Sequence, residues 1–210
     1  MRRLAYLALI ASSAVAGLAG WLAGSEHGLQ TAVRLAGTAT DGQLHIEQAS
    51  GRLLGPLDIA TLRWQGAGQH VAATGIHLDW SPADLLHGRL QVAALDIATL
   101  RIDQPPSDVP AALPADLQLP LAVTIERLSL GQADYNGQPL LQQLRGRLAS
   151  DGRQHRIDEL QLQAGDVSLA GQASLDGQAP FPLAASLDLH GQLEQRPLAV
   201  TATAKGRLDR

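Results

Sequence analysis

Apolar and polar residues alternate one by one through most of the chain beyond residue 42, and this period of two limits the fold more than any other feature. Leu44 and Ile46, for example, alternate with His45 and Glu47. The same pattern recurs at 76–80, 90–102, 160–164, 167–175, 183–189 and 198–204. Successive side chains of an extended strand point to opposite faces. The pattern therefore predicts strands with one apolar and one polar face.

Turn dipeptides lie between several of these segments, at Asn136-Gly137, Asp151-Gly152 and Asp176-Gly177. Asn, Asp and Gly accept the left-handed backbone of tight hairpin turns. Because short connections make neighbours in sequence neighbours in space, the chain is predicted to form an antiparallel meander.

One segment occurs twice, since 57–63 and 95–101 both read Leu-Asp-Ile-Ala-Thr-Leu-Arg. Looser copies follow at 125–130 and 157–162. Recurring units predict a stacked array of strands rather than a closed globule. Chance similarity among strands of this composition remains the alternative.

Two aspartates hold the same place in the exact copies, Asp58 in the first and Asp96 in the second. Paired carboxylates also occur in glycosidases, but recurrence at equivalent positions favours a structural role at a sheet edge or a bulge. In the second copy's strand we expect Asp96 to be the only polar residue on a face formed by Leu90, Val92, Ala94, Ala98, Leu100 and Ile102.

Three segments depart from the strand pattern. Helical spacing of apolar residues over Glu26–Leu35 predicts a short helix that stops at Gly37. The segment 81–88 has a serine N-cap, a proline at the first helical position and a glycine stop, so it predicts a short helix whose Leu85 and Leu86 cover the sheet. Five prolines in 104–120 withhold backbone donors and predict an extended crossing or loop.

The first residues form an uncharged stretch from Leu4 to Ala23 that follows Arg2 and Arg3. Its length suffices to cross a hydrocarbon core of about 30 Å, and the positive-inside rule places the remainder outside the cytoplasm. We expect a retained, single-pass inner-membrane anchor with the bulk of the chain in the periplasm. A cleaved signal peptide is the alternative.

One-sided strands need a cover, and the sequence offers no long amphipathic helix to supply one. The sheet can fold as a sandwich, close as a barrel or remain an open trough. Aromatic residues are only 3% of the chain, and small aliphatic residues favour a smooth, open groove that meets lipid. The predicted lipid-facing residues are Leu160, Leu162, Val167, Leu169, Leu175, Leu183, Leu187, Leu189, Leu198 and Val200.

Several blocks resemble the N-terminal region of the TamB family, the AsmA-like inner-membrane subunits of the translocation and assembly module. The blocks are Gly42–Leu44, Gly51–Leu57, Leu78–Leu90 and Pro180–Leu183. The most specific block contains Trp80, Pro82, Leu85, Leu86 and Gly88, which the resemblance marks as structural. The resemblance implies a signal anchor, a long grooved β-sheet, phospholipid transport between the membranes, and outer-membrane protein assembly with the partner TamA. Family members are several times longer, and the region that meets TamA has no counterpart here.

Other function classes lack support in the sequence. The net charge of −4 argues against nucleic-acid binding. The seven histidines show no metal-ligand spacing, and the chain has no cysteine. No nucleophile elbow, Walker loop or dinucleotide fingerprint occurs. We therefore expect no metal, no cofactor and no enzymatic activity, although an exported hydrolase is kept as a third hypothesis.

The predicted organisation is an anchor at 1–24, a short helix and connection at 25–41, a first sheet segment at 42–103 with a helix at 81–88, a Pro-rich loop at 104–120, and a second sheet segment at 121–210. We expect the sheet to continue past residue 210, or a partner to supply the next strand, because the last residues are strand-like. The leading hypothesis is a lipid-conducting groove. The alternative is a scaffold that docks outer-membrane or partner proteins by strand addition.

Overall fold

The computed structural model describes residues 25–66, 68–104, 116–193 and 196–207. These form one α-helix, one 3₁₀ helix and a single sheet. The elements are α2 (Glu26–Ala39), β1 (Leu44–Gly51), β2 (Leu57–Gly66), β3 (Gln69–Ser81), η1 (Pro82–His87), β4 (Arg89–Asp103), β5 (Ala122–Tyr135), β6 (Gln138–Leu141), β7 (Gln143–Ser150), β8 (Gln154–Ala164), β9 (Val167–Asp176), β10 (Pro182–Leu193) and β11 (Arg196–Arg207).

The strands form one open, curved layer in the order β1-β2-β3-β4-β5-β7-β8-β9-β10-β11, with β6 paired to β5 outside this path. All neighbours are antiparallel except β4 and β5. The prediction of a mainly β, open sheet is confirmed. The prediction of an antiparallel meander fails at this one parallel pair.

The parallel pair explains the Pro-rich stretch between β4 and β5. Parallel neighbours both start at the same end of the sheet, so their connection must return across it. Residues 116–121 lie at the end where β5 begins, because Asp116 bridges Gln178 and the Leu119 N–H donates to the Gly152 carbonyl. The rest of the stretch, 105–115, lies outside the described residues.

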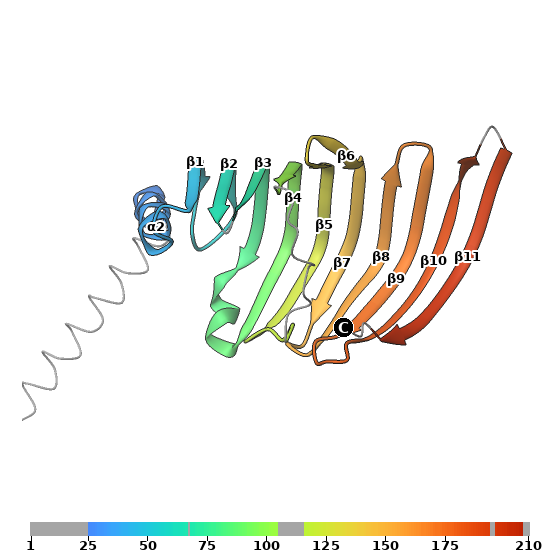
Figure 1. The fold of residues 1–210 in the computed structure, drawn as a ribbon. Helices are drawn as coiled ribbons and strands as arrows, with labels where there is room; N and C mark the ends of the chain where they lie inside the picture. The colour runs from blue at the N-terminus through green and yellow to red at the C-terminus, as the bar shows by residue number, and fades with distance from the viewer. Residues whose placement is uncertain (1–24, 67, 105–115, 194–195, 208–210) are drawn as a thin grey trace, which may run out of the picture.

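Helix α2 lies beside β1 at one end of the row of strands (Figure 1). The Ser25 hydroxyl accepts a hydrogen bond from the Gly28 N–H at its start. The predicted stop at Gly37 is wrong, because the helix continues to Ala39. The Gln30 side chain donates to the Ala49 carbonyl of β1 at 2.9 Å, so the helix covers an otherwise open sheet edge.

A column of irregular positions crosses the first five strands at Gln48, Ala60, Gly75, Ala98 and Gly131. The cross-strand pairs flank these positions and skip them, as Thr74↔Thr99 and Ile76↔Ile97 flank Gly75 and Ala98. Gln48 and Gly75 have positive φ angles of 53° and 59°. Each strand thus carries one extra residue, and apolar residues three positions apart return to the same face.

The expected face of β4 is wrong in its middle for this reason. The pairing of β3 with β4 is irregular near Asp79, and it skips Ala98. At each of these two places the alternation of side chains between the two faces of β4 shifts by one residue. Leu95 and Ile97 pair with Leu78 and Ile76 on the apolar face, whereas Asp96 pairs with His77 on the polar face. Asp96 is therefore no intruder, and the expected edge or bulge position of Asp58 and Asp96 is also wrong.

The two exact copies of the repeat occupy the same level of the sheet, in β2 and β4 on either side of β3. Leu57 and Leu95 both pair with Leu78, and Leu62 and Leu100 both pair with Ala73. The looser copies are likewise aligned across β7, since Ile125 and Ile157 both pair with Leu148. The repeat therefore reflects equivalent places in a stacked array of strands.

Replacing Gly75 by alanine tests the role of the irregular column. A Cβ at this position would lie 2.8 Å from the Ala98 Cβ, and φ is 59°. We expect Gly75→Ala to lower the free energy of unfolding by roughly 1–3 kcal/mol, measured by denaturant unfolding of the full chain. Gly206→Ala is the control, because nothing lies within 4 Å of its added Cβ and its φ is not positive. Equal stability of the two variants would contradict this account of the column.

Candidate functional site: the apolar face of the sheet

The sheet carries an unbroken row of aliphatic side chains across its whole path. Direct cross-strand partners share a face, and the pairing connects one aliphatic residue from each strand to the next. We call this row the aliphatic rank. Its members are Ala49, Ile59, Ile76, Ile97, Leu130, Leu144, Leu162, Leu169, Leu189 and Val200.

All ten of the predicted lipid-facing residues lie on the face of this rank. Leu162, Leu169, Leu189 and Val200 are members of it, and the other six are placed beside it by cross-strand pairing and alternation. Nine of the ten are half-buried, and Val200 is 45% exposed. Their common face is an observation, whereas contact with lipid stays a prediction.

Nothing in the described part of the chain forms a second layer over this face. The strands of the sheet path contact their neighbours in it, β6 contacts β5 and β8, α2 contacts β1, and η1 contacts β4. Among the described residues, no large side chain falls below 2% exposure. The described leucines of β7 to β11 are only half-buried, as expected for a single layer of strands.

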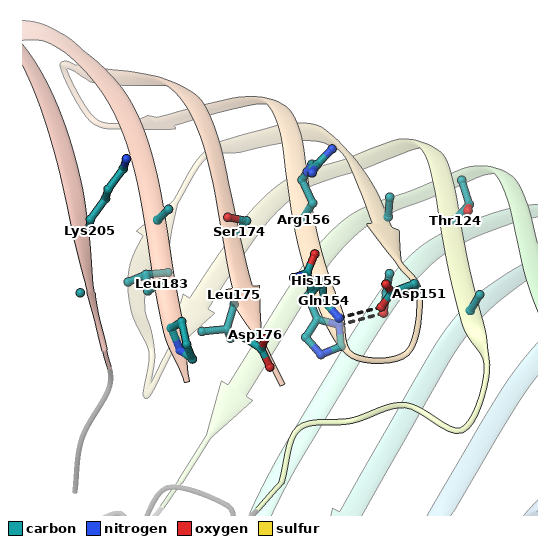
Figure 2. Close-up of a pocket in the computed structure, with 16 residues that line it drawn as sticks. Thr124, Asp151, Gln154, His155, Arg156, Ser174, Leu175, Asp176, Leu183 and Lys205 are labelled. Atoms are coloured by element: carbon teal, nitrogen blue, oxygen red, sulfur yellow. Dashed lines mark hydrogen bonds between the residues drawn. The ribbon is translucent and has the colours of Figure 1, made fainter. Parts of the chain in front are cut away.

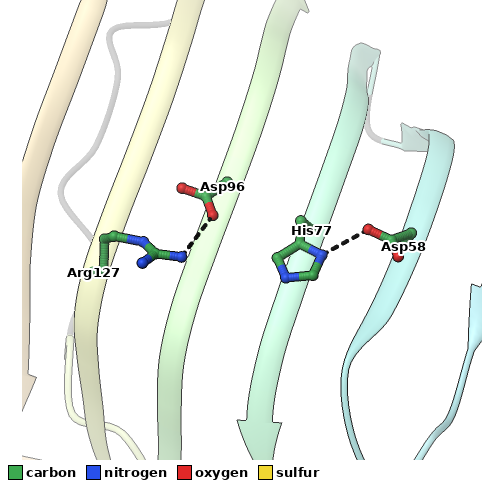
Figure 3. A network of polar contacts seen from close by, with 4 residues as sticks. All are labelled: Asp58, His77, Asp96 and Arg127. Carbon is green, nitrogen blue, oxygen red and sulfur yellow. Dashed lines mark hydrogen bonds and ion pairs between the residues drawn. The ribbon is translucent and has the colours of Figure 1, made fainter.

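The opposite face is polar at the adjoining level. Its row reads Ser50, Asp58, His77, Asp96, Ser129, Arg145, Gln161, Ala170, Asp188 and Thr201. Figure 3 shows two pairs on this face: His77 Nδ1 lies 2.7 Å from an Asp58 oxygen, and Arg127 lies 3.3 Å from Asp96. Each aspartate has its own partner, and β3 separates the two carboxylates. Both aspartates thus join neighbouring strands.

A hollow of about 670 Å³ lies at the lower ends of β5 and β7 to β11 (Figure 2). Its lining mixes Leu175 and Leu183 with residues of the polar face, among them Arg156, Ser174 and Lys205. Of the predicted groove residues, only these two leucines line it, and Leu162 and Leu169 line a smaller one of about 280 Å³. The apolar face is therefore a continuous surface and is not gathered into one pocket.

The hairpin turn beside this hollow is held by Asp151. The backbone N–H of Gln154 donates to its carboxylate at 2.7 Å (Figure 2), and the backbone N–H of Arg153 donates to it at 2.8 Å. These hydrogen bonds favour the ionised form and lower the pKa of the Asp151 carboxyl from its ordinary value of 3.8.

One histidine fastens the end of the crossing segment to the strand ends. His155 lies on the apolar face opposite Leu175, and its Nε2 lies 2.9 Å from the Leu117 carbonyl while its Nδ1 lies 2.9 Å from the Ser150 hydroxyl. The Leu117 N–H also donates to the Gly177 carbonyl. We call residues 116–119 the rim segment, because it follows the strand ends beside the apolar face.

From the sequence, the histidines were considered only as possible metal ligands, and this role was missed. The alternation could have indicated this position. His155 stands two residues before the apolar Ile157, so the two side chains share one face of the strand. Within the described ranges, no cluster of three or more His, Cys, Asp or Glu residues has the geometry of a metal site.

The residues of the most specific motif gather where β3 passes into β4. Trp80 pairs with Val92, Pro82 begins η1, and Gly88 ends it with a φ of 70°, which glycine adopts without strain. The helix is found where predicted, but as a 3₁₀ turn, and the Ser81 side chain makes no capping hydrogen bond.

The expectation that Leu85 and Leu86 cover the sheet is wrong. No residue of η1 is buried, and Leu86 is 89% exposed.

Comparison with protein families gives one match, to the model of the TamB N-terminal domain over residues 15–181. The chain belongs to the TamB N-terminal domain family. No curated protein and no solved structure matches significantly. The match covers the aliphatic rank from β1 to β9 together with the rim segment and η1.

Within the described residues, no helix has the length and apolar character required to span a bilayer. The predicted anchor at 1–24 lies outside them.

Substituting His155 tests whether it holds the rim segment. We expect His155→Ala to remove a hydrogen bond worth about 0.5–1.5 kcal/mol, and so to speed amide hydrogen exchange at Leu117 and Leu119 by roughly 2- to 10-fold. His190→Ala is the matched control, because His190 is an exposed side chain on the polar face of the same sheet. Unchanged exchange at both amides in His155→Ala would show that the rim segment is held without it.

Proposed function

We propose that this chain is the inner-membrane-anchored start of a periplasmic lipid groove that takes part in phospholipid transport between the inner and outer membranes, in outer-membrane protein assembly, or in both. The observation that carries the proposal is the aliphatic rank, most of whose members are only partly buried and which has no covering layer in the described part of the chain. Membership of the TamB family supports an envelope role.

The length of the rank favours passage of lipid over storage in a pocket. Strands lie about 4.8 Å apart, so the ten strands of the path span roughly 43 Å. A hydrocarbon core of about 30 Å holds two acyl chains end to end, so the rank exceeds the length of one chain. A lipid tail can therefore move along it while contacting similar side chains at every strand.

The chemistry of the rank fits recognition of a lipid class. Burial of a methylene stabilises by about 0.8 kcal/mol and needs no directed polar group. The rank itself has neither a charge nor a hydrogen-bonding side chain, whereas the polar row lies on the opposite face. Tails would rest on the rank, and head groups would remain in water.

Photocrosslinking on the two faces tests the proposal. A photoreactive amino acid at Leu169 or Leu187 should crosslink phospholipid in cells that express the full-length protein, because both positions lie on the apolar face. The matched controls are Ser168 and Asp188, which adjoin them in sequence and face the other side. We expect lipid adducts at the leucine positions only. Comparable yields from the two faces would reject the groove.

A second candidate, strand addition by a partner protein, is favoured by the asymmetry of the sheet edges. Helix α2 covers β1, whereas β11 pairs only with β10 among the described strands. Residues 199–207 of β11 are all exposed. An uncovered edge strand offers backbone donors and acceptors to another strand.

Proline substitutions in β11 separate the two candidates. Adjacent N–H groups of a strand point to opposite sides, so one of Val200→Pro and Thr201→Pro removes an outward donor and the other disturbs the β10 ladder. Strand addition predicts that the outward variant loses partner capture while it keeps lipid crosslinking at Leu169. Thr201→Val, which retains the N–H, is the control. Partner capture by both proline variants would exclude this mode of docking.

A further inference from the structure

The 3₁₀ turn η1 exposes two adjacent leucines at the tip of the β3–β4 hairpin. Leu86 is 89% exposed and Leu85 is 39% exposed. Single exposed leucines are common on protein surfaces, but Leu86 is more exposed than any other large apolar residue in the described chain. The turn between β1 and β2 adds Leu54, which is 47% exposed at the same end of the sheet. We call Leu54, Leu85 and Leu86 the leucine tip.

Backbone hydrogen bonds hold η1 in place, and the charges of Asp84 and Arg89 beside its leucines are paired. Gly88 closes η1 in the left-handed conformation, and its N–H donates to the Leu85 carbonyl at 3.0 Å. The Ala122 N–H in turn donates to the Gly88 carbonyl at 3.1 Å, which ties the tip to β5. Arg89 lies 3.6 Å from the Asp84 carboxylate, so the two charges beside the leucines offset each other. Leu85 and Leu86 are therefore exposed on a turn that hydrogen bonds connect to the sheet.

The chain enters the described structure at this same end of the sheet. Helix α2 runs antiparallel to β1, because Gln30 contacts the Ala49 carbonyl while Gly37 adjoins Leu44. Its first residue, Glu26, therefore lies toward the end at which β1 turns into β2, which is the end that carries η1 (Figure 1). The uncharged stretch from Leu4 to Ala23 ends three residues before Glu26.

We propose that the leucine tip inserts into the outer surface of the inner membrane beside the anchor and holds the first strands of the groove against the lipid. The occupant is a phospholipid surface. The inference rests on the membrane anchor of the proposed function but not on lipid movement along the groove. No side chain of η1 is buried, so η1 adds nothing to a buried core. Contact with a membrane would give its exposed leucines a role.

Fluorescence quenching on the full-length protein in vesicles of phosphatidylethanolamine and phosphatidylglycerol tests the proposal. These 210 residues contain no cysteine, so Leu86→Cys and Leu140→Cys each introduce a single site among them for an environment-sensitive dye. Leu140 is the matched control, because it is 59% exposed and lies in β6 at the opposite end of the sheet. We expect the dye at position 86 to be quenched by nitroxide-bearing lipid and protected from aqueous iodide. The dye at 140 should behave in the opposite way.

Two results would overturn the proposal. Equal quenching by iodide at positions 86 and 140 would place the tip in water, and protection from iodide without quenching by lipid would place it against protein. A dye at Leu54→Cys adds a second reading, since Leu86→Asp should remove its quenching by lipid. Lipid crosslinking at Leu169 is measured on the same variants. If lipid quenches the dye at position 86 but no lipid crosslinks form at Leu169, the groove is rejected and the membrane contact of the leucine tip is kept.

Discussion

Cross-strand register is the constraint on which the rest of this structure depends. Each strand places one aliphatic residue at the same level, and the hydrogen-bonded ladders bring these residues side by side from Ala49 to Val200. Cross-strand pairs of this kind contribute roughly 0.2–1 kcal/mol each. In a single layer of strands, these contacts between neighbouring strands supply much of the stabilisation that a second layer would otherwise provide. A slip of one residue in any pair would interrupt the rank and the polar row together.

The irregular column shows how long strands keep one apolar face while they bend. Without the extra residues at Gly75 and Ala98, the leucines above and below them would face opposite sides of the sheet. Small residues occupy the column in β2 to β5, where strands approach closely; an added Cβ on Gly131 would lie 2.5 Å from the Ala98 carbonyl oxygen. The column thus keeps the apolar face continuous along these strands.

The two faces divide the chemistry of the protein. Charges and hydrogen bonds join strands on one face, as in the pairs Asp58–His77 and Arg147–Glu159, both of which are largely exposed. The other face is formed mainly by aliphatic side chains, and the hydrogen-bonding groups described on it, His155 and Ser150, lie at the strand ends beside the rim segment. A lipid tail suits such a surface, and the same arrangement leaves one edge, β11, open among the described strands while α2 covers the other. The leucine tip lies at the end where the chain arrives from its apolar N-terminal stretch.

By itself the sequence determined most of the strands and the single face shared by the predicted groove residues, because the alternation of apolar and polar residues is a local property of the chain. It also determined the turns at Asn136-Gly137 and Asp151-Gly152, the site of η1 and the family, through short local motifs. Only the tertiary structure decided the parallel pairing of β4 with β5, the polar placement of Asp96, the use of His155 to hold the rim segment and the exposure of Leu86. Each of these depends on which residue lies opposite on another strand or on what packs above it. The register between strands and the packing over each side chain are set by contacts between segments far apart in the chain. No local sequence pattern encodes them.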